Sequence, residues 1–512
     1  MAEWASGYVT EVNYTLGYYR ELSPLAMRFA LLCAGYEAPP AENFSYCELG
    51  FGQGVSLNFH AAAHAGSEFF GADINPAHVA GAQAMADASG AALDLTDDGF
   101  ADLLARPELP RFDYIGVHGV WSWISAENQA NMVEFIRRTL KPGGALYLSF
   151  NCLPGWSGSM PLRHLLTEHA GRGASGNVIN RLEGALDFTQ KLIDTGIGYF
   201  GQAGVKDKFA AISKQNRNYL AHEYMNRDWR IMHFAEVAEA LAGARLEFVA
   251  SAALVDQLDG YRIAKPGLEL LATVKDPVQY QTVRDYLINQ QFRRDIFVRG
   301  QRRLSSAEQR RRMDACHFVA LRPAAELRKM AEDGNRRGLP GELFDKLVDG
   351  LDGRIASWPE LAAANPEASA GLMRQALMLL IHFGDIAVTM APAARAAAAA
   401  PAGALNAWLA ARAGEGNECP YLCSPVIGGA VTLSAFQQMM VRVLARGVAR
   451  EPELMAQAAW ADLSAVGQRV ISAGKTCETE ADNLATLNRI AKAFLEDDLP
   501  LLTLLGLLPE NA

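Results

Sequence analysis

Between Ser45 and Asn151 the chain alternates short apolar runs with longer stretches in which apolar residues recur at helical spacing. In the stretch 127–140, for example, Met132, Phe135, Ile136 and Leu140 fall on one helix face. Strands that alternate with helices predict a parallel sheet wound on both faces. The five predicted strands are Ser45–Leu49, Glu68–Ala72, Ala92–Leu95, Phe112–Val117 and Ala145–Phe150.

The same sheet is expected to resume after a helical insertion. The segment from about 158 to 225 has helical period and few strand signals, which predicts an added helical layer. Phe234–Leu241 then predicts a helix, and Leu246–Ala250 and Leu268–Val274 are apolar runs that predict two edge strands. We therefore expect residues 1–275 to form one α/β domain that contains the insertion.

The second half of the chain is predicted to be mainly helical. Residues 276–404 form a second predicted region, where two helices and a short strand, Asp385–Val388, suggest a winged-helix-like module. Ala391–Ala404 is almost all alanine and predicts either a linker or a loose helix. Residues 405–512 are predicted to form a helical C-terminal domain. Its leucine-rich end, Leu499–Leu508, is expected to pack on the body because it lacks a basic face.

Composition narrows the function classes. With 512 residues the chain is long enough for two to four domains, and its formal net charge of -10 disfavours strong nucleic-acid binding. The seven cysteines are odd in number, so neither a disulfide framework nor a metal site is predicted. No signal peptide and no membrane-spanning apolar run is evident, so we expect a cytoplasmic protein with no membrane insertion. A homodimer is compatible with this composition.

A glycine-rich loop, Glu48-Leu49-Gly50-Phe51-Gly52-Gln53-Gly54, follows the first predicted strand. Glycines let a backbone turn sharply and approach a ligand, and the helix after the loop offers free N–H groups. The acid at Glu48 disfavours a pyrophosphate and favours a cationic or zwitterionic ligand. S-adenosylmethionine carries an ammonium and a sulfonium, so the loop is predicted to bind it.

Acids follow the next two strands. Asp73, before Ile74, lies about 20 residues after the loop and is placed to bond ribose hydroxyls, with helix capping by Asp73 or Asn75 as the structural alternative. Asp97 or Asp98 can accept from an adenine amino group, and Phe100 can pack on the ring.

The fourth strand leads into His118-Gly119-Val120-Trp121-Ser122-Trp123. Open parallel sheets place reacting groups at this end of a strand, so these residues are predicted to line the pocket of the methyl acceptor. A structural role for the histidine is the alternative. The remaining candidates for an aromatic acceptor channel are Tyr14, Tyr18 and Trp156.

Together these motifs resemble class I S-adenosylmethionine-dependent methyltransferases, which have a Rossmann-like sheet. More narrowly, the chain resembles the bacterial branch that carries a methyltransferase regulatory domain. The narrower resemblance rests on Tyr8-Val9-Thr10-Glu11-Val12-Asn13-Tyr14, Lys141-Pro142-Gly143-Gly144, Ser149–Trp156, Tyr219-Leu220-Ala221-His222-Glu223-Tyr224, Arg284-Asp285-Tyr286-Leu287 and, more weakly, Tyr421–Pro425.

The resemblance implies a set of functional residues. The expected cofactor contacts are Glu48, Gly50, Phe51, Gly52, Gly54, Asp73, Ile74, Asp98, Phe100 and His118, and the expected acceptor pocket is His118, Trp121, Trp123 and Tyr14. His222 and Glu223 either order the insertion over the cofactor or pack between helices.

The acceptor is less constrained than the cofactor. The family includes rickettsial enzymes that methylate lysines of outer-membrane proteins, so the resemblance implies a protein substrate and lysine as the acceptor. A small-molecule acceptor and a non-catalytic binding role are the alternatives. The Asx-Pro-Pro-aromatic motif of enzymes that methylate nucleic-acid amines is missing. The basic stretch Arg284–Arg312 is interpreted as a domain joint, with docking of an acidic protein as the alternative.

Overall fold

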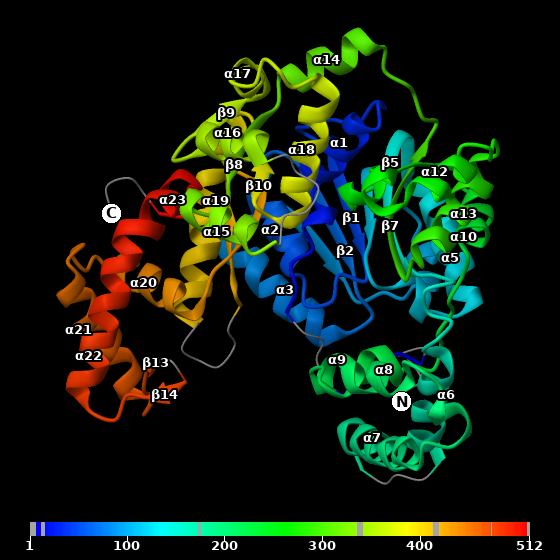
Figure 1. Ribbon diagram of the computed structural model, residues 1–512, viewed down its shortest axis with the longest axis horizontal. Helices are drawn as coiled ribbons and strands as arrows, with labels where there is room; N and C mark the ends of the chain where they lie inside the picture. The colour runs from blue at the N-terminus through cyan, green and yellow to red at the C-terminus, as the bar shows by residue number, and fades with distance from the viewer. Residues whose placement is uncertain are drawn as a thin grey trace.

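A seven-stranded sheet organises the first part of the chain (Figure 1). The structure is a computed structural model that describes residues 7–11, 16–172, 176–334, 341–412, 419–472 and 474–508. The strand order is β3-β2-β1-β4-β5-β7-β6, in which β1 to β5 run parallel and β7 runs antiparallel to both of its neighbours. The strands are β1 (Ser45–Leu49), β2 (Glu68–Ala72), β3 (Leu93–Thr96), β4 (Phe112–Val117), β5 (Leu140–Asn151), β6 (Leu246–Ser251) and β7 (Phe292–Arg299).

Side chains alternate between the two faces of this sheet, as the strand period requires. Tyr46, Tyr114 and Tyr147 point to one face, whereas Cys47 and Ile115 point to the other. The first face is covered by α1 (Pro24–Cys33), α2 (Val55–Ala63) and α3 (Pro76–Ser89); the second is covered by α4 (Phe100–Ala105), α5 (Ala126–Thr139) and α10 (Phe234–Ala242). The predicted α/β fold class is therefore confirmed.

The last part of the sheet differs from the prediction. Leu268–Val274 is not an edge strand, because α12 (Lys265–Leu271) and a turn occupy it. Strand β7, from the stretch predicted to be a basic joint, takes its place between β5 and β6. The regular pairing of β7 with β5 runs from Ala145↔Val298 to Asn151↔Phe292. The sheet thus extends past the predicted domain boundary at residue 275.

The insertion is helical. It consists of α6 (Met160–Arg172), α7 (Val178–Thr195), α8 (Val205–Ser213) and α9 (Arg217–Tyr224), which share a small apolar core that includes Leu166, Leu182 and Phe209. Figure 1 shows this layer as a separate lobe beyond the lower end of the sheet. Next come α11 (Asp259–Arg262), α12 and α13 (Pro277–Ile288).

The middle of the chain forms a small sheet with order β10-β8-β9, built from β8 (His317–Ala320), β9 (Ile355–Ser357) and β10 (Ile386–Val388). Its helices are α14 (Ser306–Asp314), α15 (Ala324–Glu332), α16 (Gly341–Leu351), α17 (Trp358–Ala363) and α18 (Ala370–Phe383). These elements pack on α1 as an extension of the first core. The helix–helix–strand order is as predicted, and the winged-helix comparison stays a prediction.

The alanine-rich stretch is a helix, α19 (Pro392–Arg412), which packs on α2 and α3. Beyond it lie the hairpins β11 (Tyr421–Ser424) with β12 (Gly429–Thr432) and β13 (Ile471–Ser472) with β14 (Lys475–Thr476), and the helices α20 (Ala435–Ala445), α21 (Pro452–Ala465), α22 (Glu480–Ala493) and α23 (Leu499–Leu504). Leu499, Leu502 and Leu505 are buried in the core of this part, so the leucine-rich end packs on the body as predicted.

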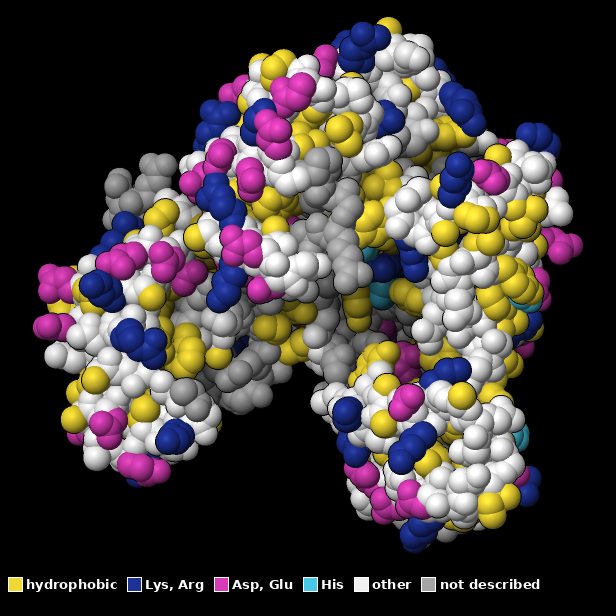
Figure 2. All heavy atoms as spheres, in the orientation of Figure 1, with side chains coloured by type: hydrophobic (Ala, Val, Ile, Leu, Met, Phe, Trp, Pro, Cys, Tyr) yellow, Lys and Arg dark blue, Asp and Glu magenta, His cyan; other side chains and the backbone are white. Residues whose placement is uncertain are grey.

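Figure 2 shows the surface of the same view. A wide gap separates the helical lobe of the insertion from the C-terminal part, and Lys and Arg side chains are interspersed with Asp and Glu over this face. Within the described ranges, none of the helices combines the length and the apolar character needed to cross a membrane.

Candidate active site

A cavity of about 500 Å³ opens at the carboxyl ends of the parallel strands. Its walls include residues directly after β1, β2, β3 and β4, together with residues of the N-terminal segment and of α9. Strand order reverses direction between β1 and β4, and open sheets bind ligands in the crevice at such a point.

The glycine loop after β1 forms one wall through Gly50, Phe51 and Gly52. Gly50 and Gly52 have φ of 71° and 59°, in the left-handed region that favours glycine. A Cβ at Gly50 would collide with Val120, whereas one at Gly52 would meet no atom within 4 Å. The cavity therefore reaches the backbone at Gly52. Gly54, expected as a contact, does not line the cavity, because it begins α2 and packs against Ala82.

Glu48 is an acid held inside the sheet beside this loop. It is 3% exposed, lines the cavity and accepts a hydrogen bond of 3.3 Å from the Tyr46 hydroxyl. Burial raises the pKa of Glu48 to about 8, with a further contribution from the charge of Asp73. Among the described residues no cation pairs with it, so a positively charged ligand would find an acid available.

Asp73 ties the loop after β2 to the glycine loop. Its Oδ2 accepts from the Gly52 N–H at 2.8 Å, and its Oδ1 accepts from the Asn75 N–H at 3.0 Å. Asn75, rather than Asp73, caps α3 by accepting from the Ala77 N–H. Asp73 and Ile74 both line the cavity, which leaves Asp73 placed for the expected ligand contact.

The loop after β3 brings Asp97, Asp98 and Phe100 to the cavity. The Asp98 carboxylate already pairs with Arg106 at 2.6 Å. Asp97 is exposed and has no recorded partner among the described residues, so the two acids differ in how readily they can accept a new hydrogen bond.

His118 follows β4 and lines the cavity as predicted. Its Nδ1 lies 2.8 Å from the Tyr147 hydroxyl, and its ring stacks on Tyr19 with 3.8 Å between centroids. Burial lowers the pKa of His118 to about 4, so the imidazole is neutral near pH 7. A neutral, stacked ring is suited to shaping a pocket wall.

The predicted aromatic channel is only partly present. Trp123 lines the cavity and stacks on Trp229 at 6.3 Å between ring centroids. Trp121 does not line it: the side chain is 1% exposed and belongs to the core between β4 and α5. Trp156 packs edge-on against Trp229, and Tyr18 packs toward Phe59 and Tyr421. Tyr14 lies outside the described residues.

The far wall of the cavity holds His222 and Glu223, which were expected either to order the insertion over the cofactor or to pack between helices, and three residues that the motifs did not assign to it. Tyr8 and Tyr19 come from the N-terminal segment, and His222, Glu223 and Asn226 come from α9 and its end. The rings of Tyr8 and His222 lie 5.4 Å apart. Tyr19 and Asn226 belong to no recognisable pattern, because they reach the cavity only when distant segments fold together.

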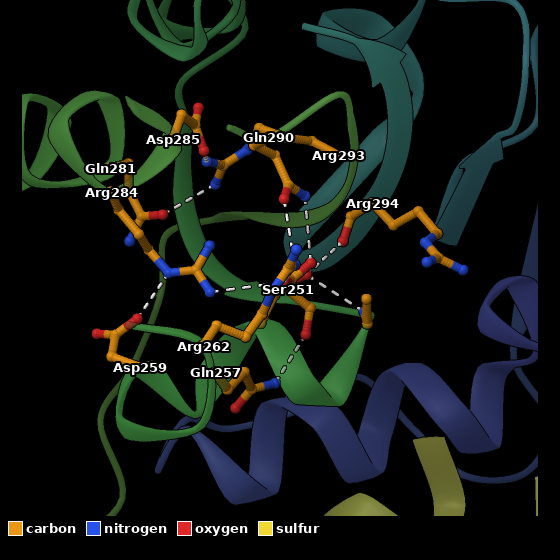
Figure 3. Close-up of polar contacts among 12 residues, drawn as sticks. Ser251, Gln257, Asp259, Arg262, Gln281, Arg284, Asp285, Gln290, Arg293 and Arg294 are labelled. Atoms are coloured by element: carbon orange, nitrogen blue, oxygen red, sulfur yellow. Dashed lines mark hydrogen bonds and ion pairs between the residues drawn. The ribbon is translucent and has the colours of Figure 1, made fainter. Parts of the chain in front are cut away.

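The first part of the basic stretch is turned inward (Figure 3), whereas Arg302, Arg303, Arg310 and Arg311 are exposed. Arg293 is 2% exposed and pairs with Asp285 and Asp295 at 2.6 Å each. Arg284 pairs with Asp259 at 2.6 Å. The Arg294 side chain points away from this cluster in Figure 3 and pairs with Glu21 at 2.7 Å, which joins β7 to the N-terminal segment.

Comparison with known proteins agrees with this geometry. Residues 47–146 match a family model described as a methyltransferase domain, and residues 216–299 match one described as a predicted methyltransferase regulatory domain. The chain is 34% identical over 510 residues to an uncharacterized protein of Synechocystis, covering 98% of this chain and 99% of that one. It is 24% identical over 294 residues to an uncharacterized protein of Rickettsia prowazekii, covering 55% of this chain and 51% of the relative.

Among solved structures, the chain is similar to PKMT2 from Rickettsia typhi in complex with AdoHcy. The TM-score is 0.69 at 15% sequence identity, and the match covers 94% of this chain and 97% of that one. At this identity the likeness shows a shared fold. With both family models and a full-length relative in agreement, the chain belongs to the S-adenosylmethionine-dependent methyltransferases that carry this regulatory domain.

Proposed function

We propose that this methyltransferase methylates the side-chain amine of lysine in a protein substrate. The observation that carries the proposal is the make-up of the cavity, which three aromatic residues, Tyr8, Tyr19 and Trp123, line together with an acid, Glu223. Aromatic faces suit the long apolar stem and the cationic head of lysine.

The sheet edge offers the groups that the cofactor needs. Glu48 would face the positive charge of the cofactor, and Gly50, Phe51 and Gly52 would lie along the cofactor. Asp73 would accept hydrogen bonds from the ribose, with Ile74 beside it. Asp97 or Asp98 and Phe100 hold the adenine, and His118 closes the wall. The open space at Gly52 and the unpaired buried Glu48 support this fit. When bound, S-adenosylmethionine supplies a methyl carbon on a positively charged sulfur.

The enzyme's task is to position the acceptor and keep its amine neutral. A lysine ammonium has a reference pKa of about 10.4, and burial between aromatic rings lowers it by desolvation. Alignment of acceptor and methyl carbon accounts for much of the rate in such a bimolecular step. The aromatic rings on the far wall would supply both effects.

Resemblance to known proteins supports lysine as the methyl acceptor. The motifs are similar to rickettsial enzymes that methylate protein lysines, and the Rickettsia typhi structure is named PKMT2. The intermixed charges on the face in Figure 2 give no single-signed patch of the kind that duplex nucleic acids require, which also fits a protein substrate.

Label transfer tests the proposal. The full chain is incubated with methyl-labelled S-adenosylmethionine and a cell lysate, and protein is separated from small molecules. We expect label in protein, recovered as methyl-lysine after hydrolysis. Label confined to the small-molecule fraction would instead support a small-molecule acceptor, and label on another amino acid would contradict lysine as the acceptor.

A further inference from the structure

The far wall of the active-site cavity carries a carboxylate without a partner. Glu223 lies in the last turn of α9, in the segment that matches the regulatory domain, and lines the cavity. Among the residues that the structure describes, none donates a hydrogen bond to its carboxylate or forms an ion pair with it. Glu223 is half-buried, and a partly desolvated carboxylate is stabilised by a cation or a donor, so this position suits a positively charged ligand.

The nearest cation to Glu223, Arg163, already binds other groups. Arg163 is 7% exposed, and its Nε and Nη2 donate to the backbone carbonyls of Glu223 and Asn226 at 3.5 and 3.2 Å. The guanidinium also lies 4.2 Å from the ring centroid of Trp229. Because burial outweighs the attraction of Arg163, the pKa of Glu223 is raised to about 7.

Glu223 reaches the cavity from α9, whereas the glycine loop reaches it from the end of β1. The charge of Glu223 acts on Tyr8, which also feels the charges of Asp73 and Tyr19. Tyr8 therefore lies between the sheet edge, where the cofactor contacts gather, and α9. Tyr19 stacks on His118 at the end of β4, the strand end that faces the reacting group in open sheets.

We propose that Glu223 binds the ammonium of the methyl acceptor and removes its proton before methyl transfer. The inference rests on the proposed amine methylation. In this step the acceptor's N–H bond breaks and an O–H bond forms: R–NH₃⁺ and the Glu223 carboxylate become R–NH₂ and the neutral acid. The nitrogen lone pair is then free to attack, and Glu223 later returns its proton to water.

The raised pKa makes this transfer feasible. An unburied ammonium of pKa about 10.4 would give its proton to an ordinary glutamate of pKa about 4.3 in roughly one molecule in a million. Glu223 has a pKa of about 7 before a ligand binds, so the difference between its pKa and that of the ammonium is smaller than for an ordinary glutamate. Desolvation of the amine by the aromatic wall narrows the remaining gap. A base whose pKa lies near the working pH is the most effective one.

A binding experiment tests the inference without a known acceptor. Sinefungin carries an amine-bearing carbon where S-adenosylmethionine has its methyl sulfonium, whereas S-adenosylhomocysteine carries no group there. Both share the same amino-acid end. Both ligands are titrated calorimetrically into the full-length wild type, Glu223→Gln and Glu48→Gln. These titrations distinguish the contribution of Glu223 to ligand affinity from that of Glu48. Glu239→Gln, an exposed acid on α10, is the matched control.

We expect Glu223→Gln to weaken sinefungin at least about tenfold and to leave S-adenosylhomocysteine unchanged, the loss typical of a hydrogen bond to a charged group. As pH increases through about 7, sinefungin affinity should rise more steeply in the wild type than in Glu223→Gln, which keeps only the pH dependence due to Glu48. Equal weakening of both ligands would overturn the inference, because Glu223 would then hold the cofactor's own ammonium. Unchanged affinity for both would also overturn it.

Failure of the proposed function has a different signature. One outcome is that label never enters lysine although Glu223→Gln still weakens sinefungin and not S-adenosylhomocysteine. That result would reject lysine as the acceptor, and Glu223 would then face an amine acceptor of another kind. If label enters lysine and Glu223→Gln keeps the wild-type pH profile of methylation, lysine stands and the role of Glu223 is rejected.

Discussion

Glu48 and Glu223 stand on different walls of one cavity, and burial raises the pKa of both into the neutral range. At the scale of single residues, this shared property has two separate consequences. Glu48 should respond to a cation at the sheet edge. Glu223 should make the stability of the folded protein depend on pH even without any ligand.

Cofactor affinity should depend on pH through Glu48. Below about pH 8 Glu48 is mostly protonated in the free protein, and a bound cation favours its ionised form, so binding releases a proton and tightens as pH rises toward 8. Glu48→Gln should bind S-adenosylmethionine about tenfold more weakly and with little pH dependence. Calorimetry from pH 6 to 9 in two buffers of different ionisation enthalpy measures both. Retention of the wild-type proton release would rule out this role.

Replacement of Glu223 should change stability with a defined sign. Its folded pKa of about 7 lies above the unfolded value near 4.5, so the folded state binds the proton more tightly and stability falls as pH rises between these values. Glu223→Gln removes the buried charge. We expect its melting temperature to exceed that of the wild type at pH 8 and to match it near pH 4.5. A variant less stable than the wild type at pH 8 would contradict the cost assigned to this charge.

Gly50→Ala should be more damaging than an alanine at an isolated left-handed glycine. The conformation alone costs an alanine roughly 1–2 kcal/mol, and at Gly50 the added methyl also collides with Val120. Gly90→Ala, with φ of 66° and nothing within 4 Å, is the matched control. Urea unfolding should show Gly50→Ala to be at least about 1 kcal/mol less stable than Gly90→Ala. Equal losses would show that Val120 moves aside freely.

The residue contacts differ in how far the sequence could predict them. The glycine loop, Asp73 and His118 follow strands, and strand ends of a parallel sheet meet at one edge. Trp121 failed as a predicted pocket residue because two tryptophans two residues apart on a short helical turn face different directions, and only Trp123 reaches the cavity. The exposure of Glu223 to the cavity depends on how the insertion folds over the sheet, which no local pattern records.

At the scale of elements, β7 is the strand of the sheet that the sequence pattern did not predict. Arg293, Arg294 and Asp295 give it the appearance of a surface segment, but each charge finds a partner once β7 lies between β5 and β6. The parallel strands β1, β2 and β4 were predictable to the residue, because each is a short, mostly apolar run that is almost entirely buried. Leu268–Val274 was misassigned because a short apolar run fits a strand and a buried helix equally well.

The buried pairs of β7 should be costly to break. Arg293→Leu leaves Asp285 and Asp295 buried without their cation, which typically destabilises a protein by about 3–5 kcal/mol. Chemical denaturation should show this loss. Arg302→Leu, at a side chain 80% exposed in its pair with Glu37, is the control and should change stability by less than about 1 kcal/mol. A small loss of stability in both variants would mean that Asp285 and Asp295 become protonated at little cost in free energy.

At the scale of the whole molecule, residues 7–11 of the N-terminal segment form a strap along the end of the helical insertion. Val9 N–H donates to Asn226 Oδ1 at 2.8 Å, and Arg227 N–H donates to the Gly7 carbonyl at 3.0 Å. Tyr8, between them, lines the cavity. A ligand in the cavity therefore touches the strap, the insertion and the sheet at once.

Hydrogen exchange should report this three-way contact. Saturating S-adenosylhomocysteine should slow amide exchange in residues 7–11 and in α9 as well as in the glycine loop, because all three line the cavity and a ligand there disfavours their local opening. Peptides from α20 to α22, remote from the cavity, are the internal control. Protection limited to the glycine loop would show that the strap and the insertion move independently of the ligand.

The pairing of β7 with β5 has a consequence for how the chain can be divided. The segment that matches the regulatory domain supplies β6 and β7 to the sheet and Glu223 to the cavity. A chain cut before residue 216 would leave β5, whose second half is fully buried, as a bare edge strand with unpaired backbone groups. Such an edge pairs readily with other chains, so the methyltransferase half alone should aggregate, and the segment that matches the regulatory domain is a part of the sheet that the fold cannot lose.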